Sequence, residues 1–278
     1  MHGTGNDYVL LDASGVEADW SELAKSMCDR HTGIGADGIL LVLPSDKADV
    51  RMRMLNPDGS EAEMCGNGIR CLAKYALEHN IIENVRDILT IDTMAGVRSL
   101  EPIWHEEKVE SVRVSMGKPE LRSEKVPVRL PEGITDGPVL NFPLKIDGTS
   151  LELTFVSMGN PHAVAFIDSP VSEFPLHSIG PAVEHNEIFP NRVNFSIVNA
   201  SRNEHRVSAR VWERGAGETM ACGTGACAIA VAMRLQGYKH KDVDITLPGG
   251  VVTVSWDGVN QVYLEGAATE VFEGEWEL

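Results

Sequence analysis

Two cysteines of this sequence introduce similar segments, one in each half of the chain. Cys65 begins the run C-G-N-G-I-R-C, and Cys222 begins the run C-G-T-G-A-C. Each run leads into apolar residues with the spacing of a helix, from Ile69 in the first copy and over 226–233 in the second. The N-terminus of a helix carries unpaired N–H groups and partial positive charge, which lower the pKa of a thiol and bind a carboxylate. The repeat therefore predicts two thiols with a lowered pKa, each beside donors for a carboxylate.

The other three cysteines suit different roles. Cys71 and Cys227 lie within the two predicted helices, where a turn of about 100° per residue points them away from the cysteine that begins each run. We expect them to pack in the core. The sequence contains neither C-x-x-C nor H-E-x-x-H, and its nine histidines are scattered, so no metal site is expected. An odd count of five cysteines without a visible export signal favours reduced thiols in the cytoplasm.

Polar residues gather near both runs. The segment N-P-D-G-S begins at Asn56, shortly before the first run, and the segment W-E-R-G-A-G-E-T holds Glu213 and Arg214 shortly before the second. An arginine beside a glycine-rich anion site is suited to hold a carboxylate through paired hydrogen bonds. Loop asparagines more often complete turns, so the residue types alone leave both roles open. Further amide, imidazole and guanidinium groups come from Asn160, His162, Arg192 and Asn194.

The segment 33–38 matches the dinucleotide-binding pattern G-x-G-x-x-G, but its context does not fit. That pattern must follow a strand and open a helix, so that the phosphates meet the helix N-terminus. Here a predicted helix near 20–27 precedes it and an apolar strand at 39–43 follows. The looser G-x-G-x-x-A at 223–228 opens a helix, but a loop separates it from the preceding strand. We therefore expect no nucleotide cofactor.

Composition narrows the classes of partner. The chain has 278 residues, 43% of them hydrophobic, and a formal net charge of −17. Such a negative surface repels phosphate backbones and anionic lipids, so neither nucleic acid nor a membrane is expected as a partner. No apolar run approaches the ~20 residues of a membrane span.

The length favours two domains, and alternating apolar patterns predict many strands and few helices. Prolines and glycines between Lys118 and Gly148 predict a linker or an irregular crossing.

The segments 2–7, 30–38, 56–71, 158–162, 192–194 and 212–227 together closely resemble the diaminopimelate epimerase family, and the resemblance extends over nearly the whole chain. The runs N-P-D-G-S-E-A-E-M-C-G-N-G-I-R-C and W-E-R-G-A-G-E-T-M-A-C-G-T-G are highly specific to it. The resemblance implies an α+β fold of two similar, pseudo-symmetric domains, each a mostly antiparallel sheet or barrel wrapped round a central helix. The active site would lie in the cleft between them. Residues 1–118, with a C-terminal strand at about 268–278, would form the first domain, and residues 119–267 the second.

The resemblance also implies a reaction, the interconversion of LL- and meso-2,6-diaminopimelate in lysine and peptidoglycan precursor synthesis. Family members are isomerases that use no pyridoxal phosphate, and they are usually homodimers. Inversion at one carbon needs a base on one face and an acid on the other, which two cysteines can supply. By resemblance Cys65 and Cys222 are this catalytic pair, and His162 and Glu213 tune them. The residues implied in binding are Asn6, Asn56, Gly66, Asn67, Asn160, Asn194, Glu213, Arg214, Gly223 and Thr224, of which the four at the helix starts receive the reacting carboxylate.

Two departures and two alternatives accompany this interpretation. Some family members carry a glutamine at the position of Gly38, and most have a short strand before the segment that opens this chain at Met1. A proline-type racemase of the same fold would also use two cysteines, but it needs no binders for a distal amino-acid centre. A protein without catalytic activity, in which Cys65 and Cys222 serve binding or redox sensing, is the alternative from another class.

Overall fold

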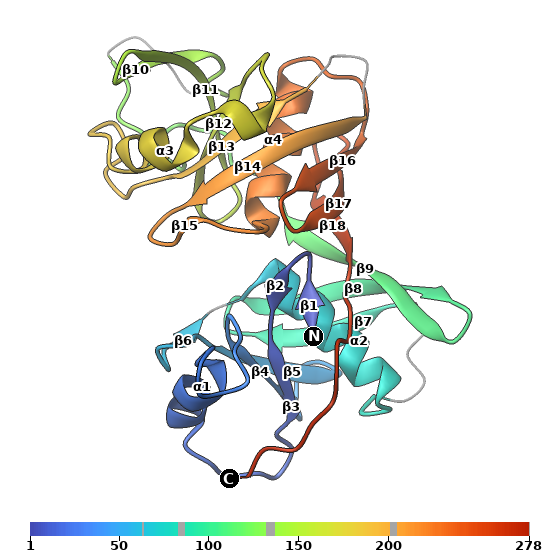
Figure 1. Cartoon of the computed structure of the whole chain (residues 1–278). Coiled ribbons are helices and arrows are strands. Elements are labelled where there is room, and N and C mark those ends of the chain that lie inside the picture. Colours follow the sequence, from blue (N-terminus) through green and yellow to red (C-terminus); the bar gives the residue numbers. More distant parts are fainter. Residues whose placement is uncertain (63, 83–86, 132–136, 201–204, 278) are drawn as a thin grey trace. The chain divides into compact units, whose positions relative to one another are not determined.

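The computed structural model describes residues 1–62, 64–82, 87–131, 137–200 and 205–277. These residues form two compact units (Figure 1). Unit 1 comprises Met1–Ser115 and the C-terminal stretch from Glu265 onward, and unit 2 comprises Met116–Leu264. The chain leaves unit 1 within strand β9 (Lys108–Gly117) and returns to it within strand β18 (Val262–Ala267). Unit 1 is therefore built from two separate parts of the sequence.

Unit 1 is a sheet with two helices. Its strands follow the order β9-β8-β7-β5-β4-β3, and β6 pairs with β5. The pairs β3–β4 and β5–β7 are parallel, and the other described pairs of this sheet are antiparallel. A separate ribbon is formed by β1 and β2. The bounds are β1 His2–Gly3, β2 Asn6–Asp7, β3 Val9–Asp12, α1 Trp20–Cys28, β4 Ile39–Leu43, β5 Val50–Leu55, β6 Glu61–Ala62, α2 Gly66–Glu78, β7 Leu89–Thr93 and β8 Gly96–His105.

Unit 2 repeats this plan. Its strands follow the order β10-β11-β12-β13-β14-β16-β17, with β15 paired to β14. The pairs β12–β13 and β14–β16 are parallel, and the other pairs among these strands are antiparallel. The bounds are β10 Phe142–Ile146, β11 Thr149–Ser157, β12 Pro161–Phe166, η1 Val171–Glu173, α3 Leu176–Glu184, β13 Asn194–Asn199, β14 Arg206–Glu213, β15 Gly217–Glu218, α4 Gly223–Leu235, β16 Asp242–Leu247 and β17 Gly250–Ser255. The α+β fold predicted from the sequence, with a central helix in each unit, is confirmed.

The two central helices owe their burial to their apolar pattern. In α2, Ile69, Leu72, Ala73 and Ala76 lie on one face at helical spacing and are fully buried. In α4, every residue from 226 to 233 is buried, as expected for a helix that is apolar all round. Gly237 stands just after the last turn with φ +91°, a conformation that suits glycine and ends the helix. Both helices begin directly after a cysteine, as predicted.

Two expectations need correction. The predicted strand over 268–278 is absent from residues 268–277, where only an isolated bridge joins Thr269 to His2, and residue 278 lies outside the described part. This stretch carries four glutamates and no alternation of apolar residues, which disfavours a strand. The expected linker at 118–148 contains β10, because Phe142, Leu144 and Ile146 alternate and pack on the core of unit 2. Residues 132–136 of that segment lie outside the described residues.

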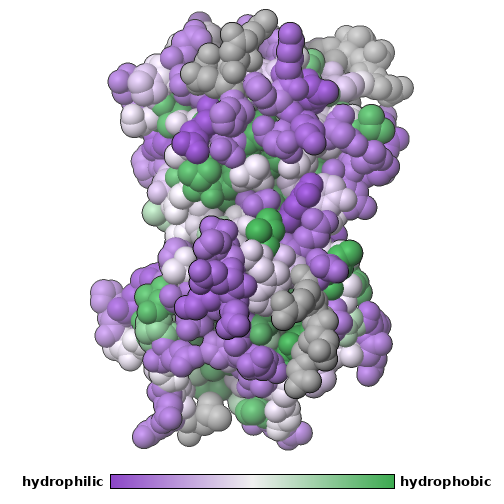
Figure 2. Space-filling view, turned by 90° about the vertical axis from the view of Figure 1, so that its right-hand side faces the viewer, coloured by the Kyte–Doolittle hydropathy of each residue, from purple (hydrophilic) through white to green (hydrophobic). Residues whose placement is uncertain are grey.

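Figure 2 shows hydrophilic side chains over most of the visible face, with apolar ones in small separate patches. Among the described residues, no helix has the length and apolar character that crossing a membrane requires. The segment 33–38 connects α1 to β4 and opens no helix, so the dinucleotide pattern lacks the context it needs.

Candidate active site

Cys65 is held at the start of α2 by contacts from the first residues of the chain. It is the residue that precedes the helix, with extended backbone angles, and its side chain caps no helix N–H. Instead, the Tyr8 hydroxyl lies 3.0 Å from Cys65 Sγ, and Asn6 Oδ1 lies 3.6 Å from it. Cys65 is half-buried, whereas the other four cysteines are buried, and all five are free. Its sulfur is therefore both hydrogen-bonded and the most accessible thiol of the described residues.

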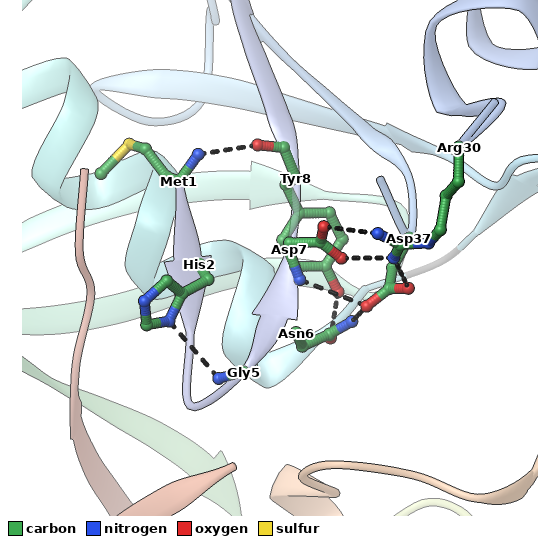
Figure 3. A network of polar contacts seen from close by, with 8 residues as sticks. All are labelled: Met1, His2, Gly5, Asn6, Asp7, Tyr8, Arg30 and Asp37. Atoms are coloured by element: carbon green, nitrogen blue, oxygen red, sulfur yellow. Dashed lines mark hydrogen bonds and ion pairs between the residues drawn. The ribbon is translucent and has the colours of Figure 1, made fainter. Parts of the chain in front are cut away.

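Asn6 is oriented by charged residues behind it. Its Nδ2 donates to Asp37 Oδ2 at 2.6 Å, which turns Oδ1 toward Tyr8 and Cys65. The Arg30 guanidinium donates to both Asp7 and Asp37, at 2.7 to 3.0 Å. Figure 3 shows this network, which runs from Arg30 through Asp37 to Asn6 and the Tyr8 hydroxyl. The β2 segment therefore lies in a fixed place beside the sulfur.

The first turn of α2 is tied to the same ribbon. The fully buried Arg70 donates from Nη1 to the Gly66 carbonyl and from Nη2 to Thr4 Oγ1. Gly3 approaches so closely that a Cβ there would lie 2.8 Å from the Asn67 carbonyl oxygen. Asn67 is buried, and Gly66 is buried with it. These contacts fix the N-terminal N–H groups of α2 relative to β1.

Two further positions of unit 1 were singled out from the sequence. Asn56 begins the turn before β6, where its Nδ2 donates to Ser60 Oγ at 3.0 Å, so it completes a turn of its own loop. A Cβ at Gly38 would lie 2.7 Å from the Leu55 carbonyl oxygen. A glutamine could enter there only if β5 moved, which explains why this chain has glycine at that position.

Cys222 has a different environment at the start of α4. Its Sγ accepts a hydrogen bond from the Gly225 N–H at 3.3 Å and lies 3.6 Å from Thr224 Oγ1. Burial raises the pKa of the Cys222 thiol well above its usual range, and the nearby Glu213 carboxylate adds to the rise. The expectation of a lowered pKa at both helix starts is therefore wrong for Cys222. Loss of solvent around Cys222, a residue that is only 4% exposed, outweighs the positive end of the helix.

Two polar residues, Asn160 and Thr224, connect His162 to Cys222. His162 Nε2 lies 2.9 Å from Asn160 Oδ1, and Asn160 Nδ2 donates to Thr224 Oγ1 at 3.2 Å. Because an amide oxygen only accepts, Nε2 carries the proton and Nδ1 is an unprotonated nitrogen. Among the described residues Nδ1 has no hydrogen-bond partner. Burial, with the charge of Arg214, lowers the pKa of His162 to about 3, so the ring is neutral.

The loop that follows β14 is fixed by Asn194. This buried amide donates to the Pro161 carbonyl and accepts from the Arg214 N–H, both at 2.9 Å. Glu213 accepts a hydrogen bond from the Thr219 hydroxyl at 2.6 Å. The Arg214 side chain is exposed, with Nη1 donating to the Asn191 carbonyl. Asn194 thus supports the loop backbone, and Arg214 presents a cation at the surface of unit 2.

The structure brings together two of the predicted groups. In unit 1, Asn6 lies beside Cys65, and in unit 2, Asn160, His162 and Thr224 form one hydrogen-bonded chain to Cys222. Tyr8 and Asp37 were missed, since neither carries a local sequence signal for this role.

Within the described residues, one group could hold a metal: His79, Glu270 and Glu273. His79 follows the last residue of α2, so it lies at the end of that helix opposite to Cys65.

Comparison of structures gives the fold. A hydroxyproline epimerase from Agrobacterium vitis matches with a TM-score of 0.65 at 15% identity, covering 96% of this chain and 86% of that chain. At this identity the likeness shows the fold alone. The protein thus has the fold of this epimerase, with a cysteine at the start of the central helix in each unit.

Sequence comparison gives the family. The family model described as diaminopimelate epimerase matches residues 1–122 and 154–271. Proteins of that name from Desulfovibrio desulfuricans and Moorella thermoacetica are each 47% identical to this chain, the first over 99% of this chain and 96% of its own length, the second over 100% and 98%. This chain belongs to the diaminopimelate epimerase family, and it is an isomerase that acts on amino acids.

Proposed function

We propose that this protein converts LL-2,6-diaminopimelate to meso-2,6-diaminopimelate, and the reverse, by proton transfer at one α-carbon without a cofactor. The observation that carries the proposal is the presence of a cysteine directly before the central helix of each unit, in a chain that matches diaminopimelate epimerases over its whole length. The product would serve the synthesis of lysine and of peptidoglycan precursors.

The proposed chemistry uses one thiolate and one thiol. The thiolate removes the α-proton and becomes a thiol, and the other thiol delivers its proton to the opposite face and becomes a thiolate. The charge that develops on the α-carboxylate needs donors, because the reaction has no other electron sink. The N–H groups at the starts of α2 and α4 are suited to this, and they belong to Gly66, Asn67, Gly223 and Thr224. The buried Cys222, whose pKa is raised, suits the acid role in the resting enzyme.

The remaining polar residues are proposed to tune the thiols and to hold the distal end of the substrate. His162 is neutral and has an unprotonated Nδ1, so it can accept a hydrogen bond. Glu213 acts on Cys222, since its carboxylate already raises the pKa of that thiol. The exposed guanidinium of Arg214 suits a carboxylate. The proposed binders of the distal amino and carboxyl groups are Asn6, Asn56, Asn160, Asn194, Glu213 and Arg214.

The location and assembly of the protein are also proposed. Five free cysteines suit a reducing cytoplasm, where thiols persist without oxidation. We propose a homodimer on the basis of the resemblance to the family. Diaminopimelate is the proposed small-molecule partner, and the net charge of −17 argues against nucleic acid or an anionic membrane as a further one.

Proton NMR in heavy water tests the reaction. LL-diaminopimelate is incubated with the reduced protein, and we expect the meso isomer to form with deuterium at the inverted α-carbon and no added cofactor. If the folded protein left the α-protons unexchanged, this function would be wrong. Proline and hydroxyproline in the same assay would then test the racemase alternative, for which the fold is the only support.

Cysteine variants test the proposed pair. Replacing Cys65 or Cys222 by alanine should lower epimerisation by a factor of roughly 10² to 10⁴, the usual contribution of a positioned acid or base. Cys28→Ala is the control, because Cys28 also lies in unit 1 but is buried, and burial raises its pKa to about 11. Equal activity of the Cys65→Ala variant and the control, in the NMR assay, would contradict the two-thiol mechanism.

A further inference from the structure

Tyr8 is the residue closest to the Cys65 sulfur that neither the sequence motifs nor the proposed mechanism uses. Its hydroxyl lies 3.0 Å from Sγ and hydrogen-bonds Asn6 Oδ1. The ring lies against two glycines, since a Cβ at Gly68 would be 3.4 Å from its Cζ and a Cβ at Gly38 would be 3.5 Å from its Cε1. Tyr8 is only 3% exposed. Packing therefore fixes the ring, and only the hydroxyl hydrogen is free to rotate.

We propose that Tyr8 is a positioning residue for Cys65: its hydroxyl proton points to Asn6 while Cys65 is a thiol and turns to the sulfur when Cys65 becomes a thiolate. The inference rests on the proposed function, in which Cys65 alternates between these two forms. It goes beyond that function because it assigns the means by which the unit 1 thiolate is stabilised and held in place.

The direction of each hydrogen bond follows from the partners. Asp37 accepts from Asn6 Nδ2, and Arg30 holds Asp37 in turn, so Asn6 Oδ1 faces the Tyr8 hydroxyl and can only accept. A thiol keeps its own proton and lies 3.6 Å from the same Asn6 Oδ1. A thiolate has no proton, so the Cys65 sulfur and Asn6 Oδ1 then compete as acceptors for the single Tyr8 hydroxyl proton. A hydrogen bond to the charged acceptor is the stronger one, so the proton turns to sulfur.

The protons on Cys65, the substrate and Tyr8 balance without any other group. When the thiolate takes the α-proton of the substrate, the new S–H replaces the hydrogen bond from Tyr8, whose proton returns to Asn6 Oδ1. The Tyr8 proton stays on the Tyr8 oxygen throughout. Burial raises the pKa of Tyr8 well above its usual range, and the Cys65 charge adds to the rise, so the hydroxyl remains a donor.

The second unit supports this role by comparison. At Cys222, the hydroxyl near the sulfur comes from Thr224, two residues after the cysteine. The corresponding position after Cys65 is Asn67, which has no hydroxyl. Tyr8, which is 57 residues away in sequence, supplies the hydroxyl that the repeat lacks in unit 1. Each sulfur thus has one hydroxyl neighbour, obtained from different parts of the sequence.

The test measures ionisation of Cys65 directly. The protein and its Tyr8→Phe variant are alkylated with iodoacetamide between pH 6 and pH 10, and the rate at each cysteine is followed by peptide mass spectrometry. Loss of the hydroxyl should raise the midpoint of the Cys65 pH–rate curve by about one pH unit, since hydrogen bonds to charged groups carry free energies of that size. The Cys222 curve, measured in the same molecules, should not move. At pH 7, kcat/KM for both directions of epimerisation should fall about tenfold together and recover at higher pH.

Controls separate positioning from folding. Tyr75→Phe removes a hydroxyl near the C-terminal end of α2, and it should leave the Cys65 midpoint unchanged. Alkylation of the fully buried Cys71 reports unfolding of a variant. If Tyr8→Phe does not fold, 3-fluorotyrosine at position 8, a stronger hydroxyl acid, should lower the midpoint. An unmoved Cys65 midpoint in either folded protein would overturn the proposal. The alkylation curves do not depend on turnover, so they remain decisive even if the NMR assay shows no epimerisation.

Discussion

At the scale of single residues, the two candidate catalytic thiols are not equivalent. Cys65 is half-buried and takes its hydroxyl neighbour from Tyr8, whereas Cys222 is almost fully buried and caps its own helix through Sγ. The repeat correctly predicted a helix directly after each cysteine, because a glycine-rich helix start and a helical spacing of apolar residues can be read from neighbouring residues. It could not predict how much solvent each sulfur would lose, since burial depends on residues distant in the sequence.

Tyr8 illustrates the same limit. In the sequence it looks like the first residue of an apolar strand, but the strand begins at Val9 and the Tyr8 hydroxyl points to a residue of another element. Only the fold brings Asn6, Tyr8 and Cys65 together. The role of Arg30 in holding Asp37 was equally invisible, because no sequence spacing marks an ion pair across a loop.

His162 gives a prediction on pH. Its pKa is about 3 in the folded protein, against 6.5 in an unfolded chain, so between these values the unfolded state binds more protons. The free energy of unfolding should therefore fall as pH drops below 6.5, by about 2 kcal/mol between pH 7 and pH 5. His162→Gln removes this titration while keeping a donor for Asn160. Urea unfolding of both proteins at pH 7 and pH 5 measures the difference, and an equal loss of stability in both would contradict the prediction.

At the scale of elements, strands and helices were predictable where the apolar period was regular. The strand at 39–43 and the helix from Trp20 lie where the pattern puts them. The pattern was misleading where prolines and glycines dominate, as around β10, because Phe142 and Leu144 pair with β11 in spite of the turn residues nearby. Close contacts between elements also could not be predicted from the sequence.

Gly180 in α3 is such a contact. A Cβ there would lie 2.6 Å from the indole ring of Trp212 in β14, whose Nε1 also donates to Glu184 of the same helix. We expect Gly180→Ala to reduce the free energy of unfolding by about 1–3 kcal/mol, because α3 must move off the sheet. Alanine favours helix over glycine, so without the clash the sign would be reversed. Urea unfolding measures the change.

The exposed Ser178 of the same helix provides the control for that measurement. Ser178→Ala should change stability by no more than about 0.5 kcal/mol, as for most surface substitutions. A Gly180→Ala protein as stable as this control would show that α3 does not pack on Trp212 as described.

At the scale of the whole molecule, charge is the dominant property. Each chain carries a net charge of −17, so two copies repel one another before any contact forms. Salt shortens the range of that repulsion, from a Debye length of ~30 Å at 0.01 M to ~8 Å at 0.15 M. If the protein is a homodimer, its dissociation should be easiest at low ionic strength.

Light scattering after size-exclusion chromatography tests this at both salt concentrations and several protein concentrations. We expect the dimer fraction at a given protein concentration to be higher in 0.15 M than in 0.01 M NaCl. A chain that remains monomeric at both would refute the proposed homodimer, and an assembly that dissociates with added salt would show that ion pairs, and not apolar contacts, hold it.

The division of unit 1 into two parts of the sequence has a consequence for how the protein is made. The backbone of His2 pairs with that of Thr269 through two hydrogen bonds of 2.9 Å, and β18 returns to unit 1 only at Glu265. Synthesis runs from the N-terminus, so every residue of unit 2 is made before Thr269, the partner of His2. The pairing that anchors the β1 strand of the ribbon carrying Asn6 is therefore formed late in synthesis. Until then unit 1, which holds Cys65, lacks its C-terminal part, so a chain whose translation stops near residue 264 would keep this unit incomplete.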